Sequence, residues 1–200
     1  RRQRQMCIRD SHIIDVDIIM EAVEKRRTCA WYEPFENFYD GILQVANMQR
    51  FFKEHSAGFH TAEAKGIWKE YTESYYQMDT YYRLFHLSFQ KSLETSSLLL
   101  DDLFKHVVDK VEGLYTHWFL GELGNNWSDV CADELAAYGK VLEVPQQEEF
   151  YCSRIKTSDT RVFVIISDAM RYEVAAAMAD QLRRETQSKV SLGSMQSIFP

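Results

Sequence analysis

The most constraining feature of this sequence is a short apolar run that stops at an acidic residue and is followed directly by a helix-forming segment. The run covers residues 162–167 and ends at Asp168, and the helical pattern follows over residues 171–186. An apolar, β-branched run of this length predicts a buried strand, so Asp168 is expected where a strand ends and the chain turns into a helix. Ligands of open α/β sheets bind at the carboxyl ends of strands. A carboxylate at this position is therefore well placed to hold a metal ion or a substrate.

A second apolar segment completes a strand–helix–strand pattern. Residues 189–195 predict another strand, and the helix between the strands carries Val174, Met178 and Leu182 on one face. Two strands joined by a helix over so short a stretch imply a right-handed parallel crossover. One crossover cannot cover both faces and both edges of a sheet, so the rest of this sheet is expected beyond residue 200.

The sequence before this pattern is predicted to be helical. Apolar residues recur at helical spacing over residues 13–23, 35–52, 64–89 and 100–118. The third of these patterns predicts one long helix with a continuous aromatic face, because its steps of three and four are unbroken. The residues on that face are Ala64, Trp68, Tyr71, Tyr75, Met78, Tyr82, Phe85 and Phe89. At this spacing aromatic residues are expected to form core rather than a base-stacking surface.

Helix ends are also predicted. The helix that begins near residue 100 is expected to end at a group of small and amide residues, which are Gly121, Gly124, Asn125 and Asn126. A shorter helix is expected over residues 127–138, and another from Pro145 to about residue 156. The expected fold class is therefore mainly α, with long antiparallel helices over residues 1–157, followed by the first β-α-β unit of an incomplete α/β domain over residues 158–200.

Composition and charge limit the classes of function. The net charge of −7 argues against a basic surface along the whole chain for nucleic acid. A local cluster of arginines (Arg1, Arg2, Arg4 and Arg9) is interpreted as a solvated helix face, with DNA binding as the alternative. No apolar run approaches the roughly 18 residues that cross a bilayer. The four scattered cysteines suit reduced thiols in the cytoplasm, and the missing initiator Met indicates a piece of a longer protein.

Several common catalytic motifs are missing from the sequence. It contains no GxxxxGK[ST] phosphate loop, no GxGxxG and no GxSxG. Met170 stands where haloacid-dehalogenase phosphatases need a second aspartate. The six histidines form no HxxxH or HExxH pair, so they are interpreted as helix-surface or partly buried residues rather than metal ligands.

The residues alone leave two interpretations of Asp168. It is either the N-cap of the following helix or a metal ligand or acid/base group at the strand end, and one carboxylate can do both. Arg171 lies near the positive end of the helix dipole, which costs about 0.3–1 kcal/mol without an anionic partner. The candidate partners are Glu173, a carboxylate on a neighbouring strand and a phosphate, and an internal ion pair with a carboxylate is favoured.

The string from Ile166 to Glu173, the Ala-rich helix after it and the sequence SIFP at 197–200 resemble the start of the PglZ domain. That family belongs to the alkaline phosphatase superfamily and occurs in the BREX and phage-growth-limitation defence systems. The similarity covers about residues 161–200. The helical region before it is similar to the segment that precedes the domain in the longer, type A members.

The resemblance implies a specific site. Asp168 is then a ligand of a divalent metal, zinc or manganese, with Arg171 and Glu173 as possible support. A Thr or Ser nucleophile and further Asp and His ligands are expected after Pro200. No catalytic residue is expected within the chain itself.

The function implied for the longer protein is metal-dependent hydrolysis of phosphoric esters in defence against bacteriophages. The isolated chain is expected to be inactive, because one aspartate cannot hold two cations. The alternative is a catalytically degenerate scaffold that binds other proteins of the defence complex. Those proteins are the expected partners, DNA is a further candidate through the longer protein, and a membrane is not expected.

Overall fold

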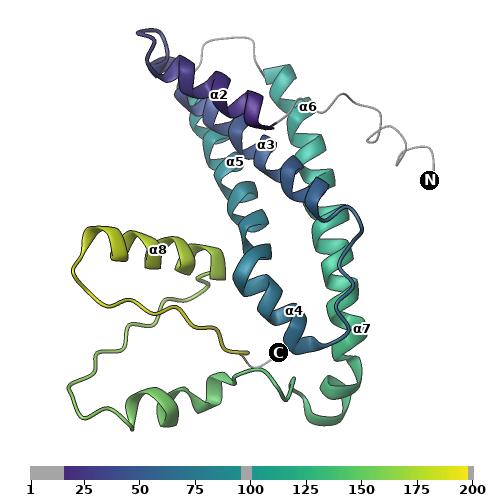
Figure 1. The fold of residues 1–200 in the computed structure, drawn as a ribbon, viewed down its shortest axis with the longest axis vertical. Helices are drawn as coiled ribbons and strands as arrows, with labels where there is room; N and C mark the ends of the chain where they lie inside the picture. Colours follow the sequence, from purple (N-terminus) through teal and green to yellow (C-terminus); the bar gives the residue numbers. More distant parts are fainter. Residues whose placement is uncertain (1–15, 96–100, 198–200) are drawn as a thin grey trace. The chain divides into compact units, whose positions relative to one another are not determined.

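The computed structural model describes residues 16–95 and 101–197, which are mainly helical (Figure 1). The arginine cluster at residues 1–9 and the end of the chain at residues 198–200 lie outside the described residues. The α-helices are α2 (Val16–Arg27), α3 (Glu36–Glu54), α4 (Ala64–Glu70), α5 (Tyr76–Thr95), α6 (Asp101–Glu112), α7 (Gly121–Tyr138) and α8 (Tyr172–Glu185). The described residues also form two 3-10 turns, η1 (Glu33–Phe35) and η4 (Gln147–Glu149). They form three π-helical segments as well, η2 (Tyr71–Tyr75), η3 (Gly113–Leu120) and η5 (Tyr151–Ile155).

The long aromatic helix is confirmed. Helical residues continue without a break from Ala64 through α4, η2 and α5 to Thr95. Along the predicted face, Ala64, Tyr75, Met78 and Phe85 are buried. The π-helical turn in the middle was not expected, because side-chain spacing does not report which carbonyl each N–H bonds.

The expected helix end at residues 121–126 is wrong. Helical residues run from α6 through η3 and α7 to Tyr138, and the helix ends at Gly139, whose φ is 68° and whose N–H donates to the carbonyl of Leu135. The interior glycines cost only about 1 kcal/mol each, which tertiary contacts can offset. One such contact is the Asn126 side chain, which donates to the Thr61 carbonyl at 3.1 Å.

The helix predicted from Pro145 is shorter and less regular than expected. Gln146 is extended, with φ −99° and ψ 140°, and two short turns follow, η4 and η5. Proline at residue 145 therefore precedes the helical turns rather than occupying the first of them.

The chain divides into two compact units. Unit 1 contains Arg1–Ser56 and Tyr81–Val111. Within it α2 packs on α3, with Val16 and Val23 buried from α2 and Met48 and Phe51 buried from α3. No helix of the described residues combines the length and the apolar composition that crossing a membrane requires.

Unit 2 contains Ala57–Thr80 and Glu112–Pro200 and has two patches of core. One is aromatic: the ring of Phe59 lies 4.8 Å from Tyr75, 5.5 Å from Trp118 and 5.8 Å from Phe119, measured between ring centroids. The other consists of Ala64, Cys131, Val141 and Val144, with Trp68, Trp127, Val130 and Leu135 against it. Burial raises the pKa of the Cys131 thiol, so this thiol behaves as an apolar core group.

The last part of unit 2 differs from the sequence prediction. Helix α8 forms at Tyr172–Glu185, close to the predicted 171–186, but the described residues contain no β-α-β unit. Residues 161–167 are extended without a partner strand, and Gln196 makes an isolated parallel bridge with Gln146 instead. A strand requires a neighbour for its N–H and C=O groups, and two strands alone are marginal in water.

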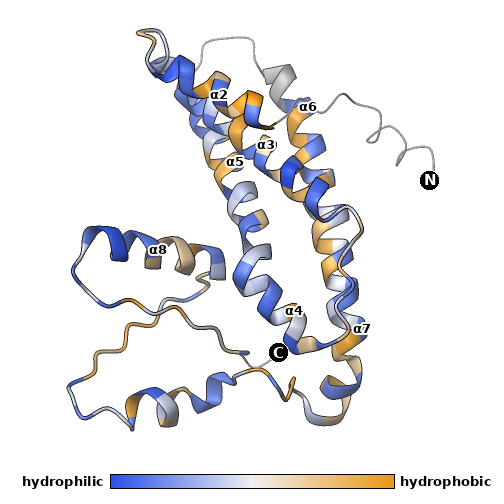
Figure 2. Ribbon diagram, viewed as in Figure 1, coloured by the Kyte–Doolittle hydropathy of each residue, from blue (hydrophilic) through white to orange (hydrophobic). Residues whose placement is uncertain are grey.

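The predicted strand residues are exposed rather than buried. Phe163 is 81%, Ile165 93% and Ile166 88% exposed, and Figure 2 shows this extended segment as hydrophobic. Helix α8 buries Glu173, Ala176 and Ala179, whereas its Met178 and Leu182 are exposed. The chain thus presents uncovered apolar surface in the region where a larger sheet was predicted.

Candidate functional site

Asp168 lies in a tight turn between the extended segment and helix α8. Its side chain is exposed to solvent, and Asp168 and Ala169 form the turn. Ala169 has a φ of 55°, in the left-handed region that costs a non-glycine residue about 1–2 kcal/mol. Backbone strain of this kind persists only where the surrounding structure fixes it, and it occurs often at functional sites.

Helix capping does not account for Asp168. Helix α8 begins at Tyr172, and its N-cap is Arg171, with φ −74° and ψ 154° and no side-chain cap hydrogen bond. Asp168 is three residues before that cap. The N-cap interpretation is therefore wrong, because Ala169 and Met170 separate Asp168 from the N-cap residue Arg171.

Arg171 forms the internal ion pair that the sequence favoured, with a partner that the sequence did not identify. Its Nη2 donates to Asp79 Oδ1 at 3.0 Å and to the Tyr115 hydroxyl at 3.0 Å. Its Nε lies 3.6 Å from Glu173 Oε1. The guanidinium thus lies between two carboxylates, one from α5 and one from the first turn of α8.

Asp79 is the centre of this group of side chains. Its side chain is only 3% exposed, and it accepts a hydrogen bond from Tyr71 at 2.8 Å on Oδ2. Tyr115 and Arg171 donate to the other oxygen, Oδ1. Burial raises the pKa of Asp79, against the opposite effect of the two tyrosine hydroxyls and the guanidinium. Burial and the Asp79 carboxylate raise the pKa of both tyrosines.

Consecutive residues attach the first turn of α8 to the other helices of unit 2. Next to Arg171, the Tyr172 hydroxyl donates to the Thr72 carbonyl at 3.1 Å, and the Tyr172 ring lies 5.4 Å from that of Tyr76. The following residue, Glu173, has an inaccessible side chain. We call the five residues Tyr71, Asp79, Tyr115, Arg171 and Glu173 the Asp79 cluster.

Both tyrosines of the Asp79 cluster lie in π-helical segments. Tyr71 begins η2, and Tyr115 lies within η3. Single π-helical turns inside α-helices are rare and are frequent at functional sites.

Sequence reasoning missed Asp79, although a signal for it exists. Asp79 follows Tyr75 by four residues and Tyr71 by eight, which places a carboxylate on the predicted aromatic face. A charge on a buried face needs hydrogen-bonding partners or an opposite charge. The partner could not be read from the sequence, because Arg171 is 92 residues away.

The described residues supply one candidate metal ligand rather than a complete site. Asp168 is exposed and carries a carboxylate, which suits a divalent cation. No group of three or more His, Cys, Asp or Glu side chains within the described part of the chain could hold a metal ion. A metal site that includes Asp168 would therefore need further ligands from outside these residues.

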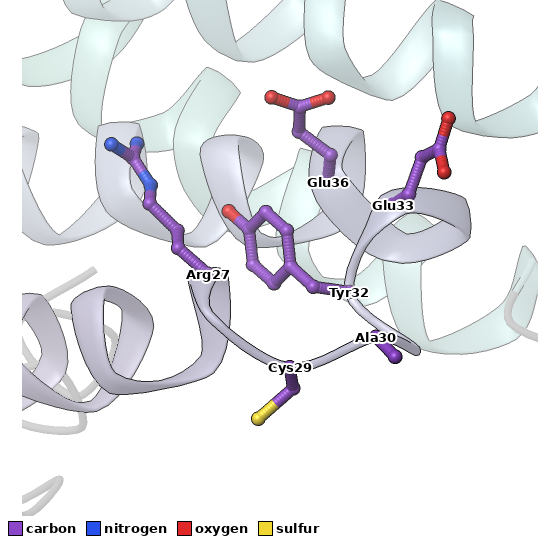
Figure 3. Close-up of a pocket in the computed structure, with 6 residues that line it drawn as sticks. All are labelled: Arg27, Cys29, Ala30, Tyr32, Glu33 and Glu36. Carbon is purple, nitrogen blue, oxygen red and sulfur yellow. The ribbon is translucent and has the colours of Figure 1, made fainter.

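A surface hollow in unit 1 contains neither Asp168 nor any residue of the Asp79 cluster. It is lined by Arg27, Cys29, Ala30, Tyr32, Glu33 and Glu36, and Figure 3 shows the Cys29 side chain pointing away from the Tyr32 ring. Arg27 lies 3.1 Å from Glu24 and 3.6 Å from Asp40, and Tyr32 stacks on Tyr39 at 5.3 Å. These ion pairs and the stacked rings explain why these side chains lie together.

Comparison with known proteins shows which family the chain resembles. Residues 152–200 match the family described as the BREX system PglZ alkaline phosphatase-like domain. Over 191 residues the chain is 30% identical to an alkaline phosphatase-like protein PglZ of Bacillus cereus (strain H3081.97). The chain is therefore similar to proteins of the PglZ family. Over 202 residues it is also 29% identical to an alkaline phosphatase-like protein BrxZ of Escherichia coli O9:H4 (strain HS).

The PglZ resemblance seen at residues 166–173 is thus confirmed, and the similarity extends through the helical region. The two alignments cover 94% and 96% of this chain but only 22% and 23% of the two relatives. The chain therefore spans less than a quarter of the length of these PglZ relatives. No solved structure matches it.

Proposed function

We propose that the longer PglZ protein is a metal-dependent hydrolase of phosphoric esters in BREX phage defence, with Asp168 as its first metal ligand. The observation that carries this proposal is the position of Asp168. It is an exposed carboxylate in a strained turn, it does not cap the helix that follows, and it lies within the residues that match an alkaline phosphatase-like domain.

The expected chemistry follows from the superfamily. Two divalent cations, zinc or manganese, would supply charge stabilisation for the attacking and the leaving oxygen at phosphorus. Asp168 would supply one carboxylate oxygen to such a site, and the described residues do not complete it. The Thr or Ser nucleophile and the other ligands are expected after Pro200.

We also propose that residues 162–167 and 189–195 are strands of the complete PglZ domain, with α8 as their crossover. The exposed side chains of Phe163, Ile165 and Ile166 support this. Covering such an apolar run with a neighbouring strand and a layer of helices removes apolar surface from water and so stabilises the fold. The proposed division is a helical region over residues 1–157 and the start of the PglZ domain over residues 158–200.

The proposal is tested by hydrolysis of a phosphodiester by the full-length protein with added zinc or manganese. Asp168→Ala is expected to lower metal-dependent turnover by more than the about 10–100-fold that loss of a second-shell group costs. Asp159→Ala is the matched control, because Asp159 is also exposed and lies in the same stretch of unit 2. Equal turnover by wild type and Asp168→Ala would contradict the assignment.

The second candidate function is a scaffold that binds other proteins of the defence system. It is favoured by the predominance of helix among the described residues. A folded, metal-supplied, full-length protein without turnover would support the scaffold. The 200-residue chain alone is expected to be inactive, and metal-dependent turnover by it that Asp168→Ala abolishes would contradict this expectation. DNA and other BREX proteins are the proposed partners of the longer protein.

A further inference from the structure

We infer that the Asp79 cluster positions the turn that carries Asp168, so that the helices of unit 2 set the geometry of the candidate metal ligand. In this role Arg171 and Asp79 are positioning residues and are neither metal ligands nor catalytic residues. The inference rests on the proposed function for the identity of Asp168 as a ligand.

The first step is the distance along the chain. Asp168 and Arg171 are three residues apart, so their Cα atoms are at most about 11 Å apart even in a fully extended chain. Arg171 is held by Asp79 and Tyr115, each at 3.0 Å. Any movement of Asp168 therefore has to be absorbed by Ala169 and Met170, and Ala169 already has a left-handed conformation.

The second step is that the two carboxylates paired with Arg171 are buried. The side chains of Asp79 and Glu173 are 3% and 0% exposed, respectively. Burying carboxylates is unfavourable, and apolar side chains of similar volume often stabilise a fold as well or better. A buried ion pair does, however, fix one relative arrangement of two elements, which is what a positioning role requires.

A neighbouring ion pair shows the contrast. Arg183 and Asp180 pair on the same helix with side chains 45% and 60% exposed. Exposed pairs of this kind contribute little and do not hold separate elements together. Arg171 instead joins the start of α8 to α5 and η3, through hydrogen bonds that span 92 and 56 residues of sequence.

The third step is that the far end of this stretch is held by the same unit. The indole N–H of Trp68 donates to the Ser194 hydroxyl at 2.8 Å, and the N–H of Gln196 donates to the Pro145 carbonyl at 2.7 Å. Helix α8 is therefore fixed at its start, and the chain after it is fixed again near residue 195. Residues 162–167 are exposed, so the hydrogen-bonded start of α8 is the nearest anchored element after Asp168.

The test uses the full-length protein and compares Asp79→Asn and Arg171→Gln with the control Arg183→Gln. Hydrogen exchange measured by mass spectrometry reports on the peptide that contains residues 167–172. Both cluster variants are expected to raise its exchange rate at least about tenfold and to weaken zinc binding about 10–100-fold, as loss of a second-shell group does. The control is expected to match wild type in both measurements.

A double variant and a conservative variant sharpen the test. Asp79→Asn combined with Arg171→Gln is expected to resemble either single variant, because both remove the same contact. Arg171→Lys, which keeps the charge without the planar fork, is expected to fall between wild type and Arg171→Gln. It is the variant to interpret if Asp79→Asn fails to fold.

The outcomes separate this inference from the proposed function. If Asp168→Ala abolishes zinc binding while Arg171→Gln, Arg171→Lys and Asp79→Asn retain wild-type exchange and zinc affinity, the inference is overturned and the proposed function stands. If the cluster variants raise exchange at residues 167–172 while Asp168→Ala binds zinc like wild type, the proposed function fails. The positioning of the turn by the Asp79 cluster is then supported, without a metal ligand at Asp168.

Discussion

Asp79 is a nearly inaccessible carboxylate that receives hydrogen bonds from two tyrosines and an arginine. Each donor comes from a different stretch of unit 2, so Asp79 contributes to stability mainly by satisfying groups that would otherwise lose their partner. Removal of one partner from such a group costs more than the pair itself contributes.

Replacing Asp79 with Ala should therefore destabilise the 200-residue chain by about 2–4 kcal/mol. This is below the about 3–5 kcal/mol for a fully buried pair, because Arg171 is half exposed and can be hydrated. Urea unfolding measures the change. The control is Asp133→Ala, an exposed position on α7, which should stay within about 0.5 kcal/mol of wild type. Equal effects of the two substitutions would contradict the burial-based account of Asp79.

The raised pKa values of Tyr71 and Tyr115 predict a loss of stability in alkali. Above about pH 10 the unfolded chain releases these phenolic protons, while the folded chain retains them. The stability that the two hydroxyls contribute is thus complete below pH 10 and is lost as the pH rises. The slope should be as much as about 1.4 kcal/mol per pH unit for each tyrosine.

This slope is measured by urea unfolding at several pH values between about 9 and 11. The double variant with Tyr71→Phe and Tyr115→Phe should show a shallower slope, whatever its stability at neutral pH. The control is Tyr138→Phe, because Tyr138 is 62% exposed. An unchanged slope in the double variant would show that other groups cause the alkaline loss.

Residue-level prediction succeeded where the physical argument was local. A cation near the start of a helix needs an anionic partner, and Arg171 has two carboxylates beside it. The N-cap alternative for Asp168 failed, because one extra turn of chain separates Asp168 from the helix. Asp79 was missed because its partner comes from a distant part of the sequence, which only the folded chain brings close.

At the scale of elements, the end of α7 shows how tertiary contacts override local helix-breaking residues. Gly121, Gly124 and two asparagines lie within helical structure, and the helix continues to Gly139. Of these glycines, Gly139 has the left-handed conformation that favours glycine, whereas Gly121 and Gly124 are helical.

Two glycine substitutions should consequently have opposite effects. Gly139→Ala should destabilise the chain by about 1–2 kcal/mol, because alanine resists a φ of 68° although the site has room for its Cβ. Gly124→Ala should stabilise it by about 0.5–1 kcal/mol, because residue 124 is helical and also has room. Thermal unfolding of both variants measures this, and a stabilising Gly139→Ala would contradict the assigned helix end.

A substitution in the exposed apolar segment at residues 162–167 is expected to change the stability of the short chain and of the longer protein differently. Ile165→Ser should change the stability of the 200-residue chain by no more than about 0.5 kcal/mol, since Ile165 is 93% exposed. In the full-length protein the same change should cost about 2–5 kcal/mol if the residue is buried in a sheet.

Urea unfolding of both proteins gives the comparison. The control substitution is Ile18→Ser on α2, where the isoleucine is 60% exposed. It should be nearly neutral in the short chain. A neutral Ile165→Ser in the full-length protein would mean that residues 162–167 are not a buried strand there.

At the scale of the whole molecule, the mainly helical character of the described residues before residue 157 followed from the hydrophobic period, and so did the position of α8. The strands did not form, because pairing partners and a covering layer are properties of a complete sheet rather than of one segment. The division into two units and the π-helical turns were also outside what spacing can report, since they depend on long-range packing.

The family match and the structure together give the molecule a coherent organisation. Residues 152–200 match the PglZ domain, and the helices of unit 2 hold the start of α8 through the Asp79 cluster. In this account the helical region is the support on which the first segment of the domain is placed.

The most direct test of the proposed site is anomalous diffraction at the zinc edge from crystals of the full-length protein soaked with zinc. The account predicts a zinc ion about 2.0–2.2 Å from a carboxylate oxygen of Asp168, with Arg171 still paired to Asp79. Zinc bound at a site that does not include Asp168 would contradict it.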